Sequence, residues 1–329
     1  MVQRIAALVA LSLLMPGVAT SEPLPSWNDT ASRARIIEFV AAVTDPDSAG
    51  FVPVEERIAV FDNDGTLWSE QPAYFQLFYA MDFVRRHAAE YPAWRDEQPF
   101  RAVLENDMDA LLASGEKGIV ELVMASHAGM TSEEFDASVK AFFAASRHPS
   151  KKRRYDELVY QPMLELLVYL RANGFQTWIV SGGGIDFVRA FAEDAYGIPP
   201  EQVVGSQIEM AYELVGGKPT IVRQPAINFI DDKAGKPVGI ARHIGRKPIA
   251  AFGNSDGDLQ MLQYTCIGRP GTLCGIVHHT DAKREWAYGK GSHIGGLDAA
   301  LAEARQRNWT VIDMAGDWKV VYPFEAVFE

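Results

Sequence analysis

The chain has 329 residues, with 31 lysines and arginines against 43 aspartates and glutamates, for a formal net charge of −12. Hydrophobic residues make up 48% and charged residues 22%, which excludes a disordered chain, a collagen-like repeat and a disulfide-rich miniprotein. The acidic excess argues against nucleic acids and anionic membranes as partners, because both surfaces are themselves negative.

The N-terminal segment, residues 1–19, has the pattern of a secretory signal peptide. Arg4 precedes an apolar run over residues 5–15, and Gly17 and Ala19 follow at the spacing that a signal peptidase prefers. The run is shorter than the about 20 apolar residues of a membrane-spanning helix, and no later stretch approaches that length. We therefore expect a periplasmic or secreted protein that is free of the membrane after signal cleavage, with an uncleaved anchor as the alternative.

Short apolar runs that end in turns of small or polar residues predict β-strands along the rest of the chain. Four of them, and a fifth candidate, are residues 57–61, 176–180, 248–252, 273–277 and 309–314. Helical patterns lie between them, at residues 163–172, 186–196 and 238–244. This alternation predicts an α/β fold with a parallel sheet covered by helices on both faces. Ligands of such sheets bind beyond the carboxyl ends of the strands.

Residues 72–156 interrupt this alternation, because they contain no convincing strand. Helices are predicted at residues 74–89, 102–113, 119–126 and 132–146. Thr131 and Glu134 form a T-x-x-E capping box before the last of them. The segment is thus predicted to be a helical cap inserted into an α/β core made of residues 28–71 and 157–329.

The first predicted strand ends in Asp62-Asn63-Asp64-Gly65-Thr66. Two carboxylates two residues apart can converge on one cation and one substrate. A carboxylate can act as a nucleophile when a metal ion screens an incoming phosphate, and a second acid can protonate the departing alkoxide and later activate water. An ordinary aspartate-rich turn is the alternative interpretation of this motif alone.

Two later strands also end in polar clusters. Ser181 and Gly182 begin a Ser-Gly-Gly-Gly turn before a helix, where a hydroxyl and backbone N–H groups can hold an anion. Asn254, Asp256 and Asp258 follow the third strand, and oxygen-bearing side chains at alternating positions suit a hard cation such as Mg²⁺. A flexible glycine turn and a solvated acidic turn are the alternatives for the two clusters taken singly.

Taken together, the three clusters resemble the haloacid dehalogenase (HAD) superfamily, and most closely its metal-dependent phosphatases of the phosphoserine-phosphatase-like branch. The resemblance covers residues 58–262. It implies a HAD-like Rossmannoid core with a cap inserted after the first motif. The implied function is Mg²⁺-dependent hydrolysis of a small phosphorylated metabolite through an aspartyl-phosphate intermediate. The alternatives are a phosphotransferase, a phosphonate hydrolase, or a non-catalytic protein that binds phosphate or metal.

The resemblance also implies a role for each matching residue. Asp62 would be the nucleophile, and Asp64 the general acid and base with its backbone carbonyl on Mg²⁺. Phosphoryl oxygens would be bound by Thr66, Ser181 and the amide of Gly182.

A lysine must stabilise the phosphoryl charge and the nucleophile in this superfamily. Lys233 and Lys236 are the candidates, and Lys236 is preferred because a predicted helix begins just after it.

The metal motif departs from the superfamily at one position. Relatives commonly have an aspartate where this chain has Asn254, whose amide oxygen can still bind Mg²⁺ but carries no charge. Asp258 matches the second acid of the motif, and Asp256 is a possible further ligand. The expected metal ligands are therefore Asp62, Asp64, Asn254 and Asp258, with weaker Mg²⁺ binding than usual.

Two smaller features stay open on the sequence alone. Cys266 and Cys274 are either one disulfide of an exported protein or two buried thiols. His278 and His279 follow the fourth predicted strand and either face the substrate or serve as hydrogen-bonded loop residues.

Overall fold

The computed structural model describes residues 22–325, so the predicted signal peptide lies outside the described residues. Seven strands form one sheet in the order β4-β3-β2-β1-β5-β6-β7. Every neighbouring pair is parallel except β3 with β4. The strands are β1 (Ile58–Phe61), β2 (Gln176–Gly184), β3 (Val203–Val215), β4 (Lys218–Phe229), β5 (Ala250–Gly253), β6 (Leu273–His278) and β7 (Thr310–Asp313).

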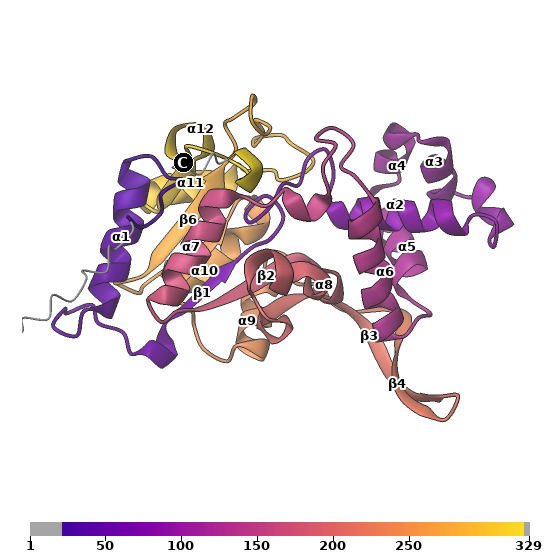
Figure 1. The fold of residues 1–329 in the computed structure, drawn as a ribbon, viewed down its shortest axis with the longest axis horizontal. Coiled ribbons are helices and arrows are strands. Elements are labelled where there is room, and N and C mark those ends of the chain that lie inside the picture. The colour runs from indigo at the N-terminus through magenta and orange to yellow at the C-terminus, as the bar shows by residue number, and fades with distance from the viewer. Residues whose placement is uncertain (1–21, 326–329) are drawn as a thin grey trace, which may run out of the picture.

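Helices cover both faces of this sheet (Figure 1). Ala59 and Phe61 of β1 point into a core shared with α1, α7 and α8, whereas Ile58 and Val60 point to α9, α10 and α11. All four residues of β1 are therefore buried, which explains why its sequence is a continuous apolar run. The predicted α/β fold is confirmed. The helices are α1 (Ala31–Thr44), α2 (Phe75–His87), α3 (Phe100–Glu105), α4 (Met108–Ala113), α5 (Gly115–His127), α6 (Ser132–Ala145), α7 (Gln161–Ala172), α8 (Ile185–Tyr196), α9 (Gly235–His243), α10 (Leu259–Cys266), α11 (Ala299–Gln306) and α12 (Met314–Asp317).

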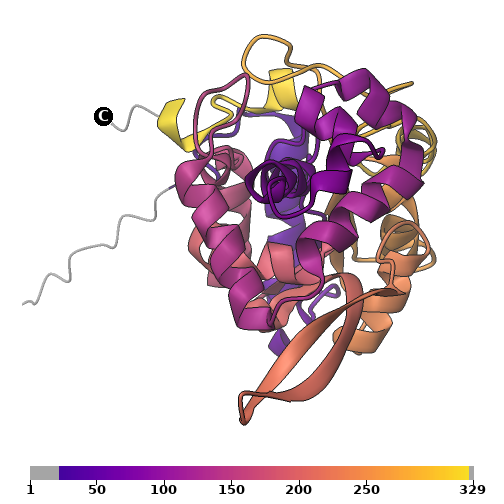
Figure 2. The ribbon, with the colours of Figure 1, turned by 90° about the vertical axis from the view of Figure 1, so that its right-hand side faces the viewer.

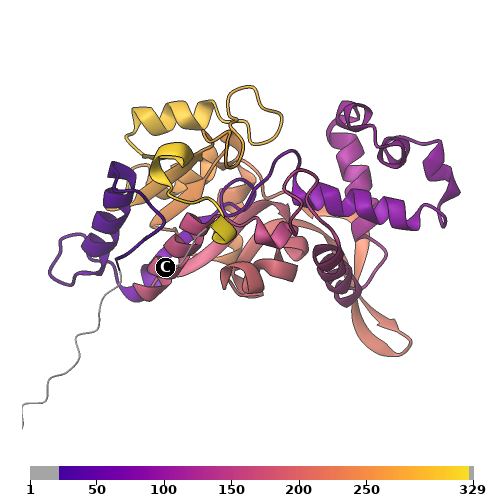
Figure 3. The same cartoon turned by 45° about the horizontal axis from the view of Figure 1, so that its top comes forward.

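Helices α2 to α6 lie together at the end of the molecule opposite α1 (Figures 1 and 3). They occupy residues 75–145, inside the segment predicted to be a cap, and α2 to α5 have a hydrophobic core of their own around Leu77, Val84 and Leu122. The single helix expected at residues 102–113 is two helices, because Asn106 adopts a left-handed conformation with φ of 58°. The next residue, Asp107, then caps α4.

The antiparallel pair β3–β4 forms an arm that projects from the sheet beside the cap (Figure 2). Gly216 and Gly217, both with positive φ, form the two-residue turn that suits such a hairpin. Arg223 of β4 reaches α5, where its Nε donates to the carbonyl oxygen of His127 at 2.7 Å. The arm therefore joins the sheet to the cap, and it has no counterpart among the predicted strands.

Helix α6 begins with the predicted capping box, which the structure confirms. The backbone N–H of Glu134 donates to Thr131 Oγ1 at 3.1 Å, and the N–H of Thr131 donates to Glu134 Oε2 at 2.9 Å. Thr131→Ala is expected to lower the free energy of unfolding by about 1 kcal/mol, because it removes an acceptor from the first turn. Urea unfolding measures the change, and Ser132→Ala, which removes the adjacent hydroxyl but not the cap, is the control. Equal losses in the two variants would contradict the capping role.

Among residues 22–325, none of the helices is both long enough and apolar enough to cross a lipid bilayer.

Candidate active site

Three loops meet at the carboxyl edge of the central strands. Phe61 of β1 pairs with Ile179 of β2 and with Phe252 of β5, so the residues that follow these three positions lie side by side. Asp62, Ser181 and Asn254 are therefore brought to one place by strand register. The predicted convergence of the three clusters at one sheet edge is confirmed.

Lys236 is the centre of a buried ionic cluster. Its Nζ lies 2.6 Å from Asp62 Oδ1 and 2.8 Å from Asp258 Oδ1, and it donates to the carbonyl oxygen of Val180 at 2.7 Å. The lysine is only 1% exposed, near the start of α9 as expected. Of the two predicted candidates, the lysine that contacts Asp62 is thus Lys236. Lys233 instead donates its backbone N–H to Gly257.

The ionisable groups of this cluster shift one another's pKa values. Burial raises the pKa of Asp62 well above its ordinary value, and the neighbouring Asp258 adds to that rise, while Lys236 opposes it. Burial disfavours the charge on Lys236, but Asp258 and Asp62 outweigh burial and raise its pKa. Lys236 therefore favours the charged form of Asp62, in opposition to burial and to the charge of Asp258.

Asp64 accepts a hydrogen bond from a tryptophan four residues further along the chain. Trp68 Nε1 donates to Asp64 Oδ1 at 2.8 Å, and the indole is buried and stacked on Phe191 with ring centroids 4.3 Å apart. Burial raises the pKa of Asp64 to about 6, although the hydrogen bond from Trp68 acts in the opposite direction. A carboxyl group that titrates this close to neutrality is suited to giving and taking a proton.

The residues expected to bind phosphate also lie in this site. Thr66 is fully buried, with its hydroxyl 3.2 Å from Asn254 Oδ1 and 3.5 Å from Asp62 Oδ2. The hydroxyl oxygen of Ser181 accepts from the backbone N–H of Gly183 at 3.0 Å, while Gly182 is exposed at the end of β2. A side chain on Gly184 would approach the amide of Gln76 on α2 within 2.8 Å, so Gln76 lies directly against this turn.

Gln76 of α2, which the sequence analysis did not select, connects the helical segment to the Ser-Gly-Gly-Gly turn. Its Oε1 accepts from the backbone N–H of Gly184 at 2.8 Å, and its Nε2 lies 2.8 Å from His127 Nε2. Burial, aided by Arg223, lowers the pKa of His127 to about 3, so the ring is neutral and can accept from Gln76. Only the packing of α2 and α5 over the sheet reveals this connection.

The oxygen donors of the site fit a hard cation such as Mg²⁺. Asp62 Oδ2 and Asn254 Oδ1 face the same hydroxyl of Thr66, and the expected backbone carbonyl of Asp64 would add a third oxygen. In the part of the chain that the structure describes, no three or more His, Cys, Asp or Glu side chains form a metal-binding group. Beside Thr66, a magnesium ion would be held by the carboxylate of Asp62, the amide oxygen of Asn254 and the backbone oxygen of Asp64.

The other two candidate ligands of the metal make different contacts. Asp258 Oδ1 pairs with Lys236, and its Oδ2 accepts from the backbone N–H groups of Asn254 at 2.9 Å and Ser255 at 3.0 Å. The carboxylate of Asp256 accepts from the N–H groups of residues 298–300, in the first turn of α11. Both acids shape the loop after β5, and their roles as metal ligands stay predictions.

The segment after β6 packs against the first motif. His279 is buried, with Nε2 2.7 Å from the carbonyl oxygen of Gly65 and Nδ1 3.2 Å from Glu285 Oε2. His279 is therefore a hydrogen-bonded loop residue, which is one of the two interpretations that the sequence left open. Gln71 Nε2 also donates to the carbonyl oxygen of Ile294 at 3.2 Å, so residues 279–297 cover the loop that follows Asp64.

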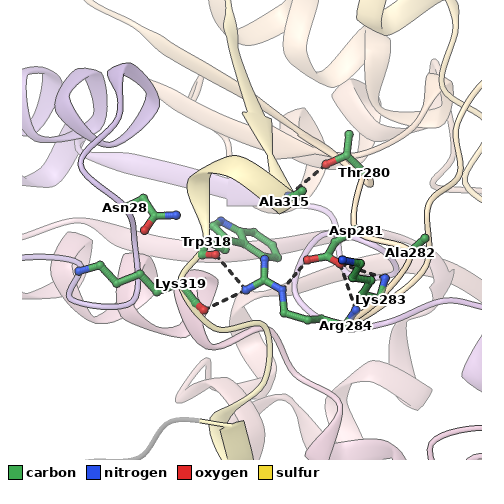
Figure 4. A pocket seen from close by; sticks show the side chains of 9 residues that line it. All are labelled: Asn28, Thr280, Asp281, Ala282, Lys283, Arg284, Ala315, Trp318 and Lys319. Carbon is green, nitrogen blue, oxygen red and sulfur yellow. Dashed lines mark hydrogen bonds and ion pairs between the residues drawn. The ribbon is translucent and has the colours of Figure 1, made fainter.

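A large surface hollow of about 690 Å³ lies elsewhere, beside the loops that follow β6 and β7 (Figure 4). Arg284 lines it, but its guanidinium is already bonded to Asp281 and to the backbone oxygens of Trp318 and Lys319. None of the residues lining this hollow is a predicted site residue, so we do not assign the chemistry to it.

Cys266 and Cys274 form a disulfide, which decides between the two alternatives that the sequence left open. The bond joins the end of α10 to β6. It therefore lies outside the active site and belongs to the framework of the sheet.

Comparison with known proteins agrees with this geometry. Residues 59–263 match the family model described as haloacid dehalogenase-like hydrolase, which is more than half of the chain. The matched range includes all the predicted catalytic, phosphate-binding and metal-binding residues. No curated protein matches the chain.

A solved structure shows the same kind of fold, and two others are reported as matches only. A conserved protein of unknown function from Anaerococcus prevotii is 19% identical, with 83% of this chain and 88% of that chain covered and a TM-score of 0.51. A protein of unknown function from Bordetella pertussis is 17% identical over 79% of this chain and 99% of that chain, with a TM-score of 0.49. A phosphoserine phosphohydrolase-like protein from Francisella tularensis is 16% identical, with 75% and 98% covered and a TM-score of 0.37.

Proposed function

The chain belongs to the haloacid dehalogenase-like hydrolase family, and from this premise we propose that it is an exported, Mg²⁺-dependent phosphatase of small phosphomonoesters. The observation that carries the proposal is the pairing of Asp62 with Lys236 at 2.6 Å, with Asp64 two residues further along the same loop. Dehalogenases of this superfamily lack the second acid, so the presence of Asp64 favours phosphate-ester chemistry.

In the first step, a carboxylate oxygen of Asp62 attacks the phosphorus atom while the bond to the leaving oxygen breaks. Asp64 gives its proton to that oxygen, and the alcohol departs. Thr66, Ser181 and the amide of Gly182 hold the phosphoryl oxygens in line with Asp62. Lys236 compensates the negative charge that builds up on the phosphoryl group and the nucleophile.

In the second step, Asp64 takes a proton from a water molecule, which attacks the phosphorus of the aspartyl-phosphate. Inorganic phosphate leaves, the carboxylate of Asp62 is restored, and Asp64 carries the proton needed for the next cycle. A pKa of about 6 for Asp64 suits both directions of this transfer. When bound, Mg²⁺ would supply positive charge that lets an anionic phosphate approach an anionic nucleophile.

Export is proposed from the N-terminal pattern, and the Cys266–Cys274 disulfide supports it, since such bonds persist in oxidising compartments. Fractionation of cells producing the full chain tests this part. Recovery of the protein from the cytoplasmic fraction at full length would contradict it.

Hydrolysis of an aryl phosphate by the purified protein tests the proposed activity. We expect turnover with Mg²⁺ and its loss in EDTA, with recovery when Mg²⁺ is added back, because the charge of the ion is needed at the phosphate. Measurement of released phosphate distinguishes hydrolysis from phosphoryl transfer to an added alcohol. Replacing the ester by a phosphonate tests whether the protein is instead a phosphonate hydrolase. Absence of turnover on a broad panel of phosphate esters, with a folded and Mg²⁺-loaded sample, would instead indicate a non-catalytic binding protein.

A further inference from the structure

The residue that departs from the superfamily pattern, Asn254, is in direct contact with a buried carboxylate that belongs to none of the three motifs. Asn254 Nδ2 donates to Glu70 Oε1 at 2.7 Å, and the two side chains are only 1% and 2% exposed. Tyr288 OH donates to the same oxygen at 2.8 Å.

This contact orients the amide of Asn254. Because a carboxylate can only accept, Glu70 takes the NH₂ end of the amide, and the opposite end, Oδ1, faces Thr66 Oγ1 at 3.2 Å. The same hydroxyl lies 3.5 Å from Asp62 Oδ2. The amide oxygen is thereby directed to the side of the nucleophile, where the cation is expected.

The backbone makes room for Glu70 at two glycines. Gly65 has φ of 74°, and a side chain there would collide with both Asn254 and Glu70. Gly295 has φ of 63°, and a side chain there would collide with Glu70 and Tyr288. Two glycines with positive φ, each too close to the carboxylate of Glu70 to carry a side chain, indicate that the backbone is shaped around that group.

The negative charge of Glu70 compensates for the uncharged amide at position 254. An aspartate at position 254 would bring one negative charge to the cation, whereas the amide of Asn254 brings none. Glu70 restores that charge one hydrogen bond behind the ligand, and a carboxylate donating electron density through the N–H also makes Oδ1 a stronger donor. An aspartate at position 254 would instead place two carboxylates in contact in a buried site.

We propose that Glu70 is a positioning residue for the metal site: it orients the amide of Asn254 toward the cation and supplies the negative charge that Asn254 lacks. The proposal rests on the proposed function, because it assumes that Mg²⁺ binds beside Asp62. Tyr288 and Gly295 complete the arrangement from residues 279–297, which lie beyond the range matched by the family model.

Isothermal titration of the purified protein with Mg²⁺, in the absence of substrate, tests this directly. Glu70→Gln keeps an oxygen that can accept from Asn254 but removes the charge, and it is expected to weaken Mg²⁺ binding by about tenfold or more. Glu165→Gln is the matched control, because Glu165 is a half-buried glutamate on α7 that hydrogen-bonds Gln161 and the backbone of Ser26. It should bind Mg²⁺ as the wild type does.

The double variant Glu70→Gln with Asn254→Asp provides the decisive comparison. It moves the charge back to position 254 and reverses the hydrogen bond, so it should recover most of the lost Mg²⁺ affinity. Asn254→Asp alone should lower the Tm of the metal-free protein, since two buried carboxylates then meet, and the double variant should restore that Tm. A merely structural role for Glu70 would not produce this recovery of affinity.

Two results would overturn the proposal. One is wild-type Mg²⁺ affinity in Glu70→Gln, and the other is a double variant that binds as weakly as Glu70→Gln. Failure of the proposed function looks different: the wild type itself would then give no Mg²⁺ binding and no metal-dependent turnover, which removes the basis of both proposals.

Discussion

Asp62→Asn is expected to lower kcat on an aryl phosphate by on the order of 10⁵-fold, as when the nucleophile of other enzymes with covalent intermediates is removed. The amide has nearly the same shape as the carboxylate but no anionic oxygen with which to attack phosphorus. Lys236 keeps its second partner, Asp258, at 2.8 Å, so the fold should persist. Steady-state kinetics in Mg²⁺ measures the loss, and a circular dichroism spectrum checks the fold.

A matched control and a chemical readout make this prediction specific. Asp194→Asn changes the same residue type at an exposed position on α8 and should leave kcat unchanged. Acid-quenched wild-type protein should carry a phosphoryl group on the peptide that contains Asp62, and the variant should not. Retention of more than about a tenth of wild-type kcat would assign the attack to another group, because that loss is far smaller than nucleophile removal causes.

Lys236→Met is expected to lower the free energy of unfolding by about 3–5 kcal/mol, because it leaves Asp62 and Asp258 buried together without a counter-charge. Both carboxylates are less than 10% exposed, so water cannot replace the lost ammonium group. The same variant should lower kcat by about 10²–10³-fold through loss of charge stabilisation at the phosphoryl group. Urea unfolding of metal-free protein gives the first quantity, and steady-state kinetics gives the second.

Lys140→Met is the control for this substitution, because Lys140 forms an exposed ion pair with Asp136 at 2.9 Å on α6. Such surface pairs contribute about 0–1 kcal/mol, so the control should remain close to the wild type. A similar small loss in both variants would show that the buried cluster does not depend on the charge of Lys236.

The amino-acid sequence determined the sheet and the edge at which the three motifs meet. Strands buried on both faces must be apolar runs, and parallel strands place all their carboxyl ends on one side, so motifs after β1, β2 and β5 had to meet. The five predicted strands are present, although β2 extends to Gly184 rather than ending at Val180. The capping box at Thr131 was predictable for the same reason: it depends only on residues within one turn of helix.

Elements outside this pattern were not predicted. The β3–β4 arm exposes apolar side chains such as Tyr212 and Leu214. Its sequence therefore lacks the regular alternation of apolar and polar residues that marks a half-buried strand. Its Gly-Gly turn, however, is a hairpin signal. Helix α1 has buried residues Ile36, Val40 and Val43 at helical spacing, and that signal was available in the sequence.

Only the tertiary structure decided which side chains surround the candidate catalytic carboxylates. Asn254 and Glu70 are 184 residues apart, and Tyr288 and Glu70 are 218 residues apart, yet they share one buried oxygen atom. The sequence indicated Asp62, Asp64 and Lys236 as candidate residues, because each lies in a short local motif. It could not indicate Glu70 or Gln76, since their positions follow from how a cap and a C-terminal segment pack on the sheet, and local residue patterns do not encode that packing.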